Sequence, residues 1–201
     1  MSEGHVYTCI QGNNSDLISE VARLYIGDGD RVADVTFGKG VFWRKSDVGR
    51  MDFRSSDIVT CPEAPYDFRD LPYDNDEFDH VVLDPPYAHS PGKMIVEGSY
   101  QNSATTKGMY HKDIINLYRE GMTEGHRILG PGGLLWVKCQ DEIESSKQKV
   151  SHIEIHDIAI GELGMIVQDM FVLMQSGKPI VQHKTQRHAR KNHSFLWIFR
   201  K

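Results

Sequence analysis

The segment Phe78-Asp79-His80-Val81-Val82-Leu83-Asp84-Pro85-Pro86-Tyr87 joins an apolar run to a rigid turn. The run from Phe78 to Leu83 has the length and the apolar, β-branched composition of a buried strand. Two consecutive prolines cannot continue a central strand, so the chain is expected to leave the sheet at Asp84. The turn therefore holds a carboxylate, Asp84, and a phenol, Tyr87, in a fixed mutual geometry.

A second strand upstream ends in a glycine turn. Residues 31–35 are short and apolar, and the run Asp34-Val35-Thr36-Phe37-Gly38-Lys39-Gly40 leads from them into Gly-x-Gly. Many such turns only connect elements. At the carboxyl end of a parallel strand, however, this turn lets the backbone approach a ligand closely.

Two acidic positions follow that suit an adenosine. Asp57 stands just beyond the next expected strand, where an acid can accept hydrogen bonds from both ribose hydroxyls. Asp67 is an acceptor for the adenine amine, and Phe68 is an apolar wall for its ring. A solvated acidic loop is the alternative interpretation of Asp67.

The remaining pattern alternates strands with helices. Besides residues 31–35 and 78–83, strands are expected at 50–54, 133–138, 165–174 and 193–199. Helices are expected at 17–26, behind the capping candidate Ser15, at about 112–129, and at 142–163, within which the isoleucines of 151–160 fit neither template cleanly. This order predicts an α/β fold around a mainly parallel sheet.

Length and composition point to one domain. A chain of 201 residues with 39 % hydrophobic content can bury one core, which assigns residues 1–201 to a single domain. No apolar run approaches the roughly 20 residues that span a bilayer, and the polar beginning lacks a signal-peptide pattern, so the expected location is the cytoplasm.

The cysteines and histidines show no metal pattern. The three cysteines are widely separated, which suits a reducing compartment: Cys9, Cys61 and Cys139. His152 and His156 could share a helical face, but no third ligand candidate lies nearby in the sequence. No metal site is expected.

Charge is segregated along the chain. The net charge is −5, which argues against a protein that coats DNA with its whole surface. Residues 177–201 nevertheless carry seven Lys or Arg and no acid. Within the basic segment 177–192, four residues are the expected phosphate contacts: Lys184, Arg187, Arg190 and Lys191. The long polar segment 88–111 is a candidate substrate loop, in which Tyr100 and Tyr110 are stacking candidates.

The proline turn suits methylation of an aromatic amine. The lone pair of such an amine is delocalised into the ring, so a catalyst must redirect it toward an electrophile. The Asp84 carboxylate and the Pro85 carbonyl can each accept one N–H of the amine, which favours a pyramidal nitrogen. Tyr87 offers a stacking face for a base turned out of the duplex.

With these motifs, the chain resembles the amino-group DNA methyltransferases, the adenine-N6 and cytosine-N4 family marked by (Asp/Asn/Ser)-Pro-Pro-(Tyr/Phe/Trp). The resemblance implies a Rossmann-like fold that closes with an antiparallel hairpin, and S-adenosyl-L-methionine as cofactor. It assigns catalysis to the motif Asp84, Pro85, Pro86 and Tyr87. It assigns cofactor binding to eight residues: Asp34, Thr36, Phe37, Gly38, Gly40, Asp57, Asp67 and Phe68.

The same resemblance extends to the turn and strand at 130–136 and to the start of the first helix. Two departures affect individual contacts. Val35, followed by Thr36, replaces the family's usual proline, and Asn13-Asn14 replaces the expected lysine-proline.

The expected reaction is methylation of adenine N6 in DNA, in a duplex with a flipped base or in a single strand. Asp at the first motif position favours adenine over cytosine N4. The chain has no space for a separate target-recognition domain, so a short or relaxed recognition sequence is expected, and by analogy a phage or bacterial enzyme. RNA adenine, a protein or small-molecule substrate, and a catalytically dead nucleic-acid-binding subunit are the alternatives, and a homodimer or a partner subunit is compatible with all of them.

Overall fold

The computed structural model describes residues 4–86, 110–176 and 187–201. At its centre lies a seven-stranded sheet with the order β1-β8-β9-β5-β4-β2-β3. Its strands are β1 (Cys9–Gly12), β2 (Arg31–Asp34), β3 (Asp52–Ser55), β4 (Phe78–Leu83), β5 (Leu129–Cys139), β8 (Ile166–Gln175) and β9 (His193–Arg200). A separate hairpin is formed by β6 (Glu142–Glu144) and β7 (Lys147–Lys149).

Most neighbouring strands of this sheet are parallel. The parallel pairs are β1 with β8, β2 with β3, β2 with β4, and β4 with β5. Only β9 runs the other way, antiparallel to both β5 and β8. The expected α/β fold, mainly parallel with an antiparallel hairpin near its end, is confirmed.

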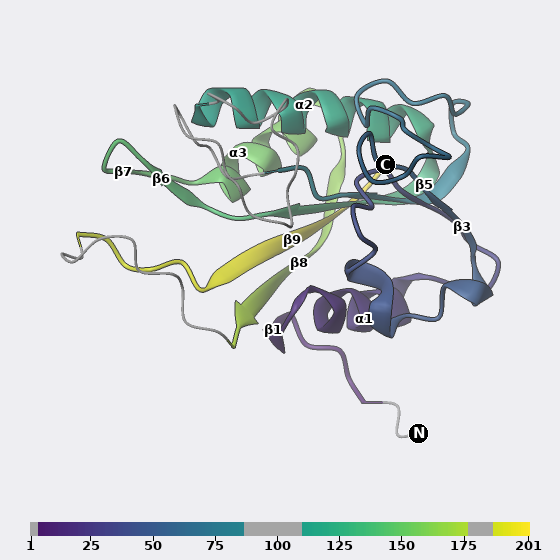
Figure 1. The fold of residues 1–201 in the computed structure, drawn as a ribbon, viewed down its shortest axis with the longest axis horizontal. Helices are drawn as coiled ribbons and strands as arrows, with labels where there is room; N and C mark the ends of the chain where they lie inside the picture. Colours follow the sequence, from purple (N-terminus) through teal and green to yellow (C-terminus); the bar gives the residue numbers. More distant parts are fainter. Residues whose placement is uncertain (1–3, 87–109, 177–186) are drawn as a thin grey trace.

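Helices cover both faces of the sheet (Figure 1). One face carries α1 (Asn14–Tyr25) and the short 3-10 helix η1 (Phe42–Lys45), with a second 3-10 turn, η2 (Val48–Arg50), before β3. The other face carries α2 (His111–Ile128) and α3 (Ser151–Asp157), which continues as a π-helical turn, η3 (Ile158–Glu162). No helix in the described part of the chain is long and apolar enough to cross a membrane.

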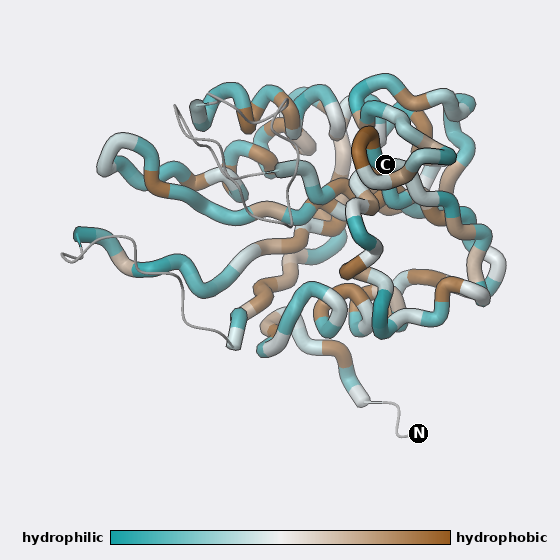
Figure 2. The backbone as a smooth tube through the Cα atoms, in the orientation of Figure 1, coloured by the Kyte–Doolittle hydropathy of each residue, from teal (hydrophilic) through white to brown (hydrophobic). Residues whose placement is uncertain are grey.

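Side chains of the strands alternate between two cores. Val81 and Val137 pack on the α2 side, whereas Val82 and Trp136 pack on the α1 side. This alternation follows from the two-residue period of a strand with both faces covered. Figure 2 shows the hydrophobic residues concentrated in the central strands, while the β6–β7 hairpin is mostly hydrophilic.

The start of α1 differs from the sequence expectation. Asn13, not Ser15, caps the helix, because its side-chain oxygen accepts from the backbone of Ser15 and Asp16. Asp16 in turn accepts from the Asn13 N–H at 2.9 Å, which completes a capping box. An Asn followed three residues later by Asp carries the same signal as the Ser expected in this role.

The helix expected over 142–163 is wrong in its first third. Residues 142–149 form the β6–β7 hairpin, and only 151–162 are helical. Ser145 and Ser146 both have positive φ, 49° and 61°, which gives a two-residue hairpin turn that lacks the usual glycine or asparagine. Glu142 and Glu144 face Lys149 and Lys147 across this hairpin, and such opposite-charge pairs stabilise a strand pair.

Other differences concern strand boundaries. The edge strand β1 was not expected, because a strand of four residues is too short to show a clear alternation of apolar and polar side chains. β5 begins at Leu129, four residues before the expected start, and a register shift between Phe78 and His80 accommodates its glycines. The strand expected at 50–54 starts at Asp52, because Arg50 belongs to η2.

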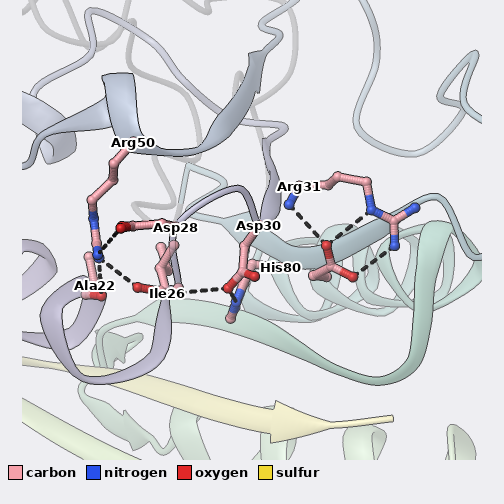
Figure 3. Close-up of polar contacts among 9 residues, drawn as sticks. Ala22, Ile26, Asp28, Asp30, Arg31, Arg50 and His80 are labelled. Carbon is pink, nitrogen blue, oxygen red and sulfur yellow. Dashed lines mark hydrogen bonds and ion pairs between the residues drawn. The ribbon is translucent and has the colours of Figure 1, made fainter.

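Polar contacts fasten the sheet at the edge where the parallel strands β2 and β4 begin (Figure 3). Arg50 donates to the carbonyls of Ala22 and Ile26 at the end of α1, at 3.0 and 2.6 Å. Asp30, just before β2, lies 3.2 Å from the Nε2 atom of buried His80 in β4. These contacts hold the amino ends of β2 and β4 in place. They do not involve the carboxyl ends of the same strands.

Candidate active site

Three of the four acidic residues expected at the site converge at the carboxyl ends of β2, β3 and β4. Asp34 ends β2 opposite Ser55 of β3 and Val82 of β4. Asp57 follows β3 by two residues, and Asp84 follows β4 directly. Parallel strands bring these ends to one edge of the sheet, which is where α/β folds bind ligands.

Asp34 anchors the glycine turn from inside the protein. Its exposed fraction is 2 %, and its carboxylate accepts from the Thr36 N–H at 3.1 Å and from Trp43 Nε1 at 2.7 Å. Burial raises the pKa of Asp34 to about 7; the hydrogen bonds from Trp43 and Thr36 oppose this rise, and the nearby carboxylates Asp84 and Asp57 add to it. Asp34 therefore fixes the glycine turn and joins it to η1 through Trp43.

The glycine turn has the backbone that its sequence requires. Gly38 and Gly40 have φ values of +56° and +66°, in the left-handed region. The Phe37 ring folds over Gly40, where a Cβ atom would lie 2.7 Å from Phe37 Cζ. At Gly38 the nearest atom to an added Cβ is the Thr36 carbonyl oxygen at 3.9 Å, so open space adjoins the backbone there.

Asp57 lies against the same turn. Its Oδ2 accepts from the Gly38 N–H at 3.2 Å, and its Oδ1 accepts from the N–H groups of Val59 and Thr60. Thr60 Oγ1 donates to the Gly38 carbonyl at 2.6 Å, which makes the contact reciprocal. Ile58, next in the chain, exposes 44 % of its surface. Sequence reasoning missed this apolar side chain, although its place directly after the acid was a usable signal.

Asp67 and Phe68 make a different set of contacts. Asp67 forms a two-point ion pair with Arg69, at 2.9 Å to Nε and 2.6 Å to Nη2, and hydrogen bonding by Arg69 lowers the pKa of Asp67. The Phe68 ring packs on α2 at Gly121, where an added Cβ would meet Phe68 Cδ2 at 2.7 Å. The ring is half-buried beside the α2-side core, which also includes Leu83.

The proline turn is held by the glycine turn. The Asp84 N–H donates to Thr36 Oγ1 at 2.7 Å, so Thr36, expected to bind cofactor, fixes the position of the proline turn. Asp84 Oδ1 is buried and has no hydrogen-bond partner within the described residues. Burial raises the pKa of Asp84 to about 6, and the Lys138 ammonium opposes this rise. Pro85 is buried and Pro86 half-buried, while Tyr87 lies outside the described residues.

A buried lysine beside this turn was missed. Lys138, in β5, has an exposed fraction of 1 %, and its Nζ donates to Ser194 Oγ of β9 at 2.7 Å. The signal was present, because Lys138 is the one charged residue in the apolar run from Leu134 to Cys139. A charge in a strand covered on both faces is expensive and calls for an explanation.

The expected phosphate contacts lie along the approach to β9. Arg187 is exposed, and Arg190 and Lys191 are half-exposed. Lys191 Nζ donates to Gln148 Oε1 at 2.6 Å, which joins this stretch to the β6–β7 hairpin. Lys184 falls outside the described residues, as do residues 88–109 of the candidate substrate loop.

The two histidines considered as metal ligands have separate partners. His152 lies 2.7 Å from Asp141 Oδ1 and stacks on Phe195. His156 contacts Asp157. In the described ranges, no group of three or more His, Cys, Asp or Glu side chains could hold a metal ion.

Solved structures with similar backbones define the class of fold. An S-adenosylmethionine-dependent methyltransferase from Methanosarcina mazei aligns with 90 % of this chain and 96 % of its own, at a TM-score of 0.53 and 10 % identity. TrmN from Thermus thermophilus aligns at 0.59 and 14 % identity, covering 93 % of this chain and 48 % of TrmN. An N1-methyltransferase from Burkholderia thailandensis, bound to 1,6-didemethyltoxoflavin and S-adenosylhomocysteine, aligns at 0.55 and 12 % identity, covering 94 % and 78 %. The fold is that of S-adenosylmethionine-dependent methyltransferases.

The family follows from the sequence match. The model of the N6/N4 methyltransferase family, described as DNA methylase, matches residues 78–201. No curated protein matches the chain. The chain belongs to the N6/N4 DNA methylase family, whose methyl donor is S-adenosyl-L-methionine and whose substrate is DNA.

The residues present fit that methyl donor. It carries a sulfonium cation and an ammonium group, and Asp34, Asp57 and Asp84 place three acids at the sheet edge. Asn14 Oδ1, at the start of α1, and Asp84 Oδ1 are buried acceptors without a hydrogen-bond partner in the described part of the chain. An ion pair between Asp16 and Lys45 joins the start of α1 to η1, next to the glycine turn. An ammonium group is the kind of donor that a buried acceptor such as Asn14 Oδ1 requires, and Asp84 Oδ1 is left for a donor of the second substrate.

Proposed function

We propose that this protein transfers a methyl group from S-adenosyl-L-methionine to the exocyclic N6 amine of adenine in DNA. The observation that carries the proposal is the buried Asp84 Oδ1, a strong acceptor without a partner among the described residues, fixed in a proline turn. An unpaired buried acceptor is costly, so a site that retains one is prepared for a donor from outside the protein.

The adenine amine supplies such a donor. One N–H of the amine bonds to Asp84 and the other to the Pro85 carbonyl, which makes the nitrogen pyramidal and directs its lone pair at the methyl group. The cofactor supplies an activated methyl, so the protein mainly has to align the two. Correct alignment of reactants accounts for about 7–11 kcal/mol in well-oriented cases. Thr36 supports the alignment, because its hydroxyl holds the Asp84 N–H.

The glycine turn and its neighbours are the proposed cofactor site. Gly38 and Gly40 provide the close backbone approach, Phe37 covers Gly40, and Asp57 accepts the ribose hydroxyls in addition to its backbone contacts. Asp34 contributes charge toward the sulfonium. Exposed Ile58 packs against one face of the adenine ring in this proposal, and Phe68 packs against the other face. Asp67 accepts a hydrogen bond from the adenine amine through the carboxylate lone pairs that its ion pair with Arg69 does not occupy.

DNA contacts are proposed for the basic segment. Arg187 and Arg190, with Lys191 and Lys184, would hold phosphates, while residues 88–111 close over the flipped base and Tyr87 stacks on it. Phosphate contacts fix register and carry no sequence information. The recognition sequence proposed for this family member is short or relaxed.

Adenine is preferred over cytosine because the motif opens with Asp, and family members that open with Ser favour cytosine N4. The test is transfer of labelled methyl to unmethylated duplex DNA by wild type and Asp84→Ala, followed by nucleoside mass spectrometry. N6-methyladenine that is lost in the variant supports the proposal. N4-methylcytosine would assign the rival base. Cofactor binding without any label in DNA would favour RNA, a required partner subunit or a dead subunit.

A further inference from the structure

Lys138 is a buried charge without a role in the activity proposed above. Its neighbours Val137 and Cys139 face the α2-side core, so Lys138 faces the α1 side together with Trp136. An apolar side chain there would avoid the cost of stripping water from an ammonium. The structure instead keeps a cation inside the sheet, at the edge that carries the catalytic turn.

The strand register brings Lys138 next to Asp84. Leu83 pairs with Val137, so the next residues along these parallel strands, Asp84 and Lys138, are level. Leu83 and Val137 both face the α2 side, and the two-residue period turns Asp84 and Lys138 together to the α1 side. Asp34 faces the same side, since Val32 packs in the α1-side core. Two carboxylates and one ammonium thus share one face of the sheet.

Ser194 directs the lysine toward this edge. Lys138 pairs with Leu196, and Ser194 lies two residues nearer the level at which β5 ends. The hydrogen bond from Nζ to Ser194 Oγ therefore extends the side chain toward the edge of the sheet that carries the catalytic turn, on the β9 side of β5. Ser194 itself is fully buried, so this anchor is not exchanged for water.

The charged and titratable groups around Asp84 come from the two adjacent strands. Asp34 of β2 repels its negative charge, Lys138 of β5 attracts it, and the Cys139 thiol stays neutral because burial raises the pKa of Cys139. Two buried carboxylates side by side do not both ionise unless a cation compensates them. Lys138 is the cation that faces Asp84 from β5; burial lowers the pKa of Lys138, and the negative charge of Asp84 opposes this change.

We propose that Lys138 is a positioning residue of the catalytic turn: anchored by Ser194, its ammonium keeps Asp84 an anion and holds it beneath the target amine. This inference rests on the proposed function for its catalytic meaning. An anionic acceptor binds the amine N–H more strongly than a neutral acid does, and a protonated Asp84 would present an O–H donor. The charge of Lys138 therefore matters through Asp84, without contact to the reacting atoms.

The direct test is the titration of Asp84 in the free protein. Carboxyl ¹³C NMR would follow wild type and Lys138→Met, with Asp84→Asn to assign the signal. We expect the pKa of Asp84 to rise by about one to three units in Lys138→Met, the usual effect of losing an adjacent opposite charge. An unchanged titration in the folded variant would overturn the proposal.

A second readout separates this role from a structural one. Lys138→Met should be less stable than wild type at neutral pH, where the Asp84 anion loses its compensating charge, and should regain stability at lower pH, where Asp84 is protonated. Its single-turnover methyl transfer should fall at neutral pH and recover as the pH rises, with the acidic limb displaced as in the NMR titration. A rate loss that is equal at every pH would contradict the proposal.

Two controls complete the design. Ser194→Ala keeps the charge and removes the anchor, so it should move the titration of Asp84 less than Lys138→Met does. If Lys138→Met does not fold, Lys138→Gln keeps a donor for Ser194 without the charge and serves the same comparison. Wild type that transfers no methyl to DNA would reject the proposed function, while the NMR titration would still decide whether Lys138 controls Asp84.

Discussion

At the scale of single residues, the hydroxyl of Thr36 decides how the two turns of the site meet. It accepts the Asp84 N–H at 2.7 Å, so Thr36→Val removes the acceptor while keeping the shape of the side chain. We expect a loss of about 1–3 kcal/mol in the free energy of unfolding, because a backbone donor is left unpaired. The methyl-transfer rate constant should fall by about 10²-fold if the turn moves by about 1 Å. Denaturant unfolding and single-turnover kinetics measure the two effects.

Thr60→Val is the matched control for this change. Thr60 donates to the Gly38 carbonyl, within the part of the turn proposed to bind cofactor, and makes no hydrogen bond to Asp84 among those described. Its loss should weaken cofactor binding and leave the rate at saturating cofactor nearly unchanged. If both valine variants altered only cofactor affinity, Thr36 would be a binding residue and not a positioning residue.

Which site residues the sequence could predict depends on whether their role is local. Asp34, Asp57 and Asp84 follow directly from turns and strand ends, and the structure brings them to one edge. Lys138 and Ser194 lie 56 positions apart, and their contact exists only because β5 and β9 pair. The link between Thr36 and Asp84 also needs the sheet, since it crosses from β2 to β4.

At the scale of elements, the sequence predicted helices and strands best where the apolar pattern repeats over many residues. The helix expected at about 112–129 is α2, shifted by one residue, because its apolar face repeats over 18 residues. The hairpin at 142–149 was missed because its strands have three residues each and its turn is Ser145-Ser146, which local rules do not mark. The β6–β7 hairpin depends on tertiary contacts, and the sequence of such short segments does not indicate those contacts.

The packing of α2 on Phe68 gives a prediction for the element. Gly121→Ala would place Cβ 2.7 Å from Phe68 Cδ2 and 2.9 Å from its Cε2, so the ring or the helix has to move. Overpacking of this kind costs about 1–3 kcal/mol, which exceeds the roughly 1 kcal/mol that alanine gains in helix propensity. We expect a net loss of unfolding free energy in denaturant titrations, with weaker cofactor binding if Phe68 supports the adenine.

Gly125→Ala, one turn later in α2, is the control. Its added Cβ would meet Leu135 Cδ1 at 3.0 Å, the end of a flexible side chain that can shift at little cost. The helix-propensity gain should then make this variant equal to wild type or more stable. Equal destabilisation by both alanines would indicate that helix–sheet spacing, and not the Phe68 ring, limits α2.

At the scale of the whole molecule, the buried acids make stability depend on pH. The pKa of Asp34 is about 7 when folded and near 3.9 when unfolded, so the folded state binds more protons between these values. Stability contributed by this group is therefore present below about pH 4 and is lost as pH rises toward 7. Asp34→Asn should flatten the slope of unfolding free energy against pH over this window. A slope unchanged by the substitution would assign the dependence to other groups, such as Asp84.

The same charges predict how cofactor binding depends on pH. Asp34 and Asp84, with pKa values of about 7 and 6, share one sheet face with a single lysine, so the free site loses protons as pH rises from about 5 to 8. A sulfonium cation favours the ionised acids, and linkage then requires its affinity to increase over that window, by up to about tenfold per pH unit for each proton released. S-adenosylhomocysteine has the same groups without the sulfonium charge, and its affinity should change much less. Calorimetric titration of both ligands from pH 5 to 8 measures the difference. Parallel curves for the two ligands would mean that the acids respond to the shared ammonium or to conformation, and that the sulfonium lies away from Asp34 and Asp84.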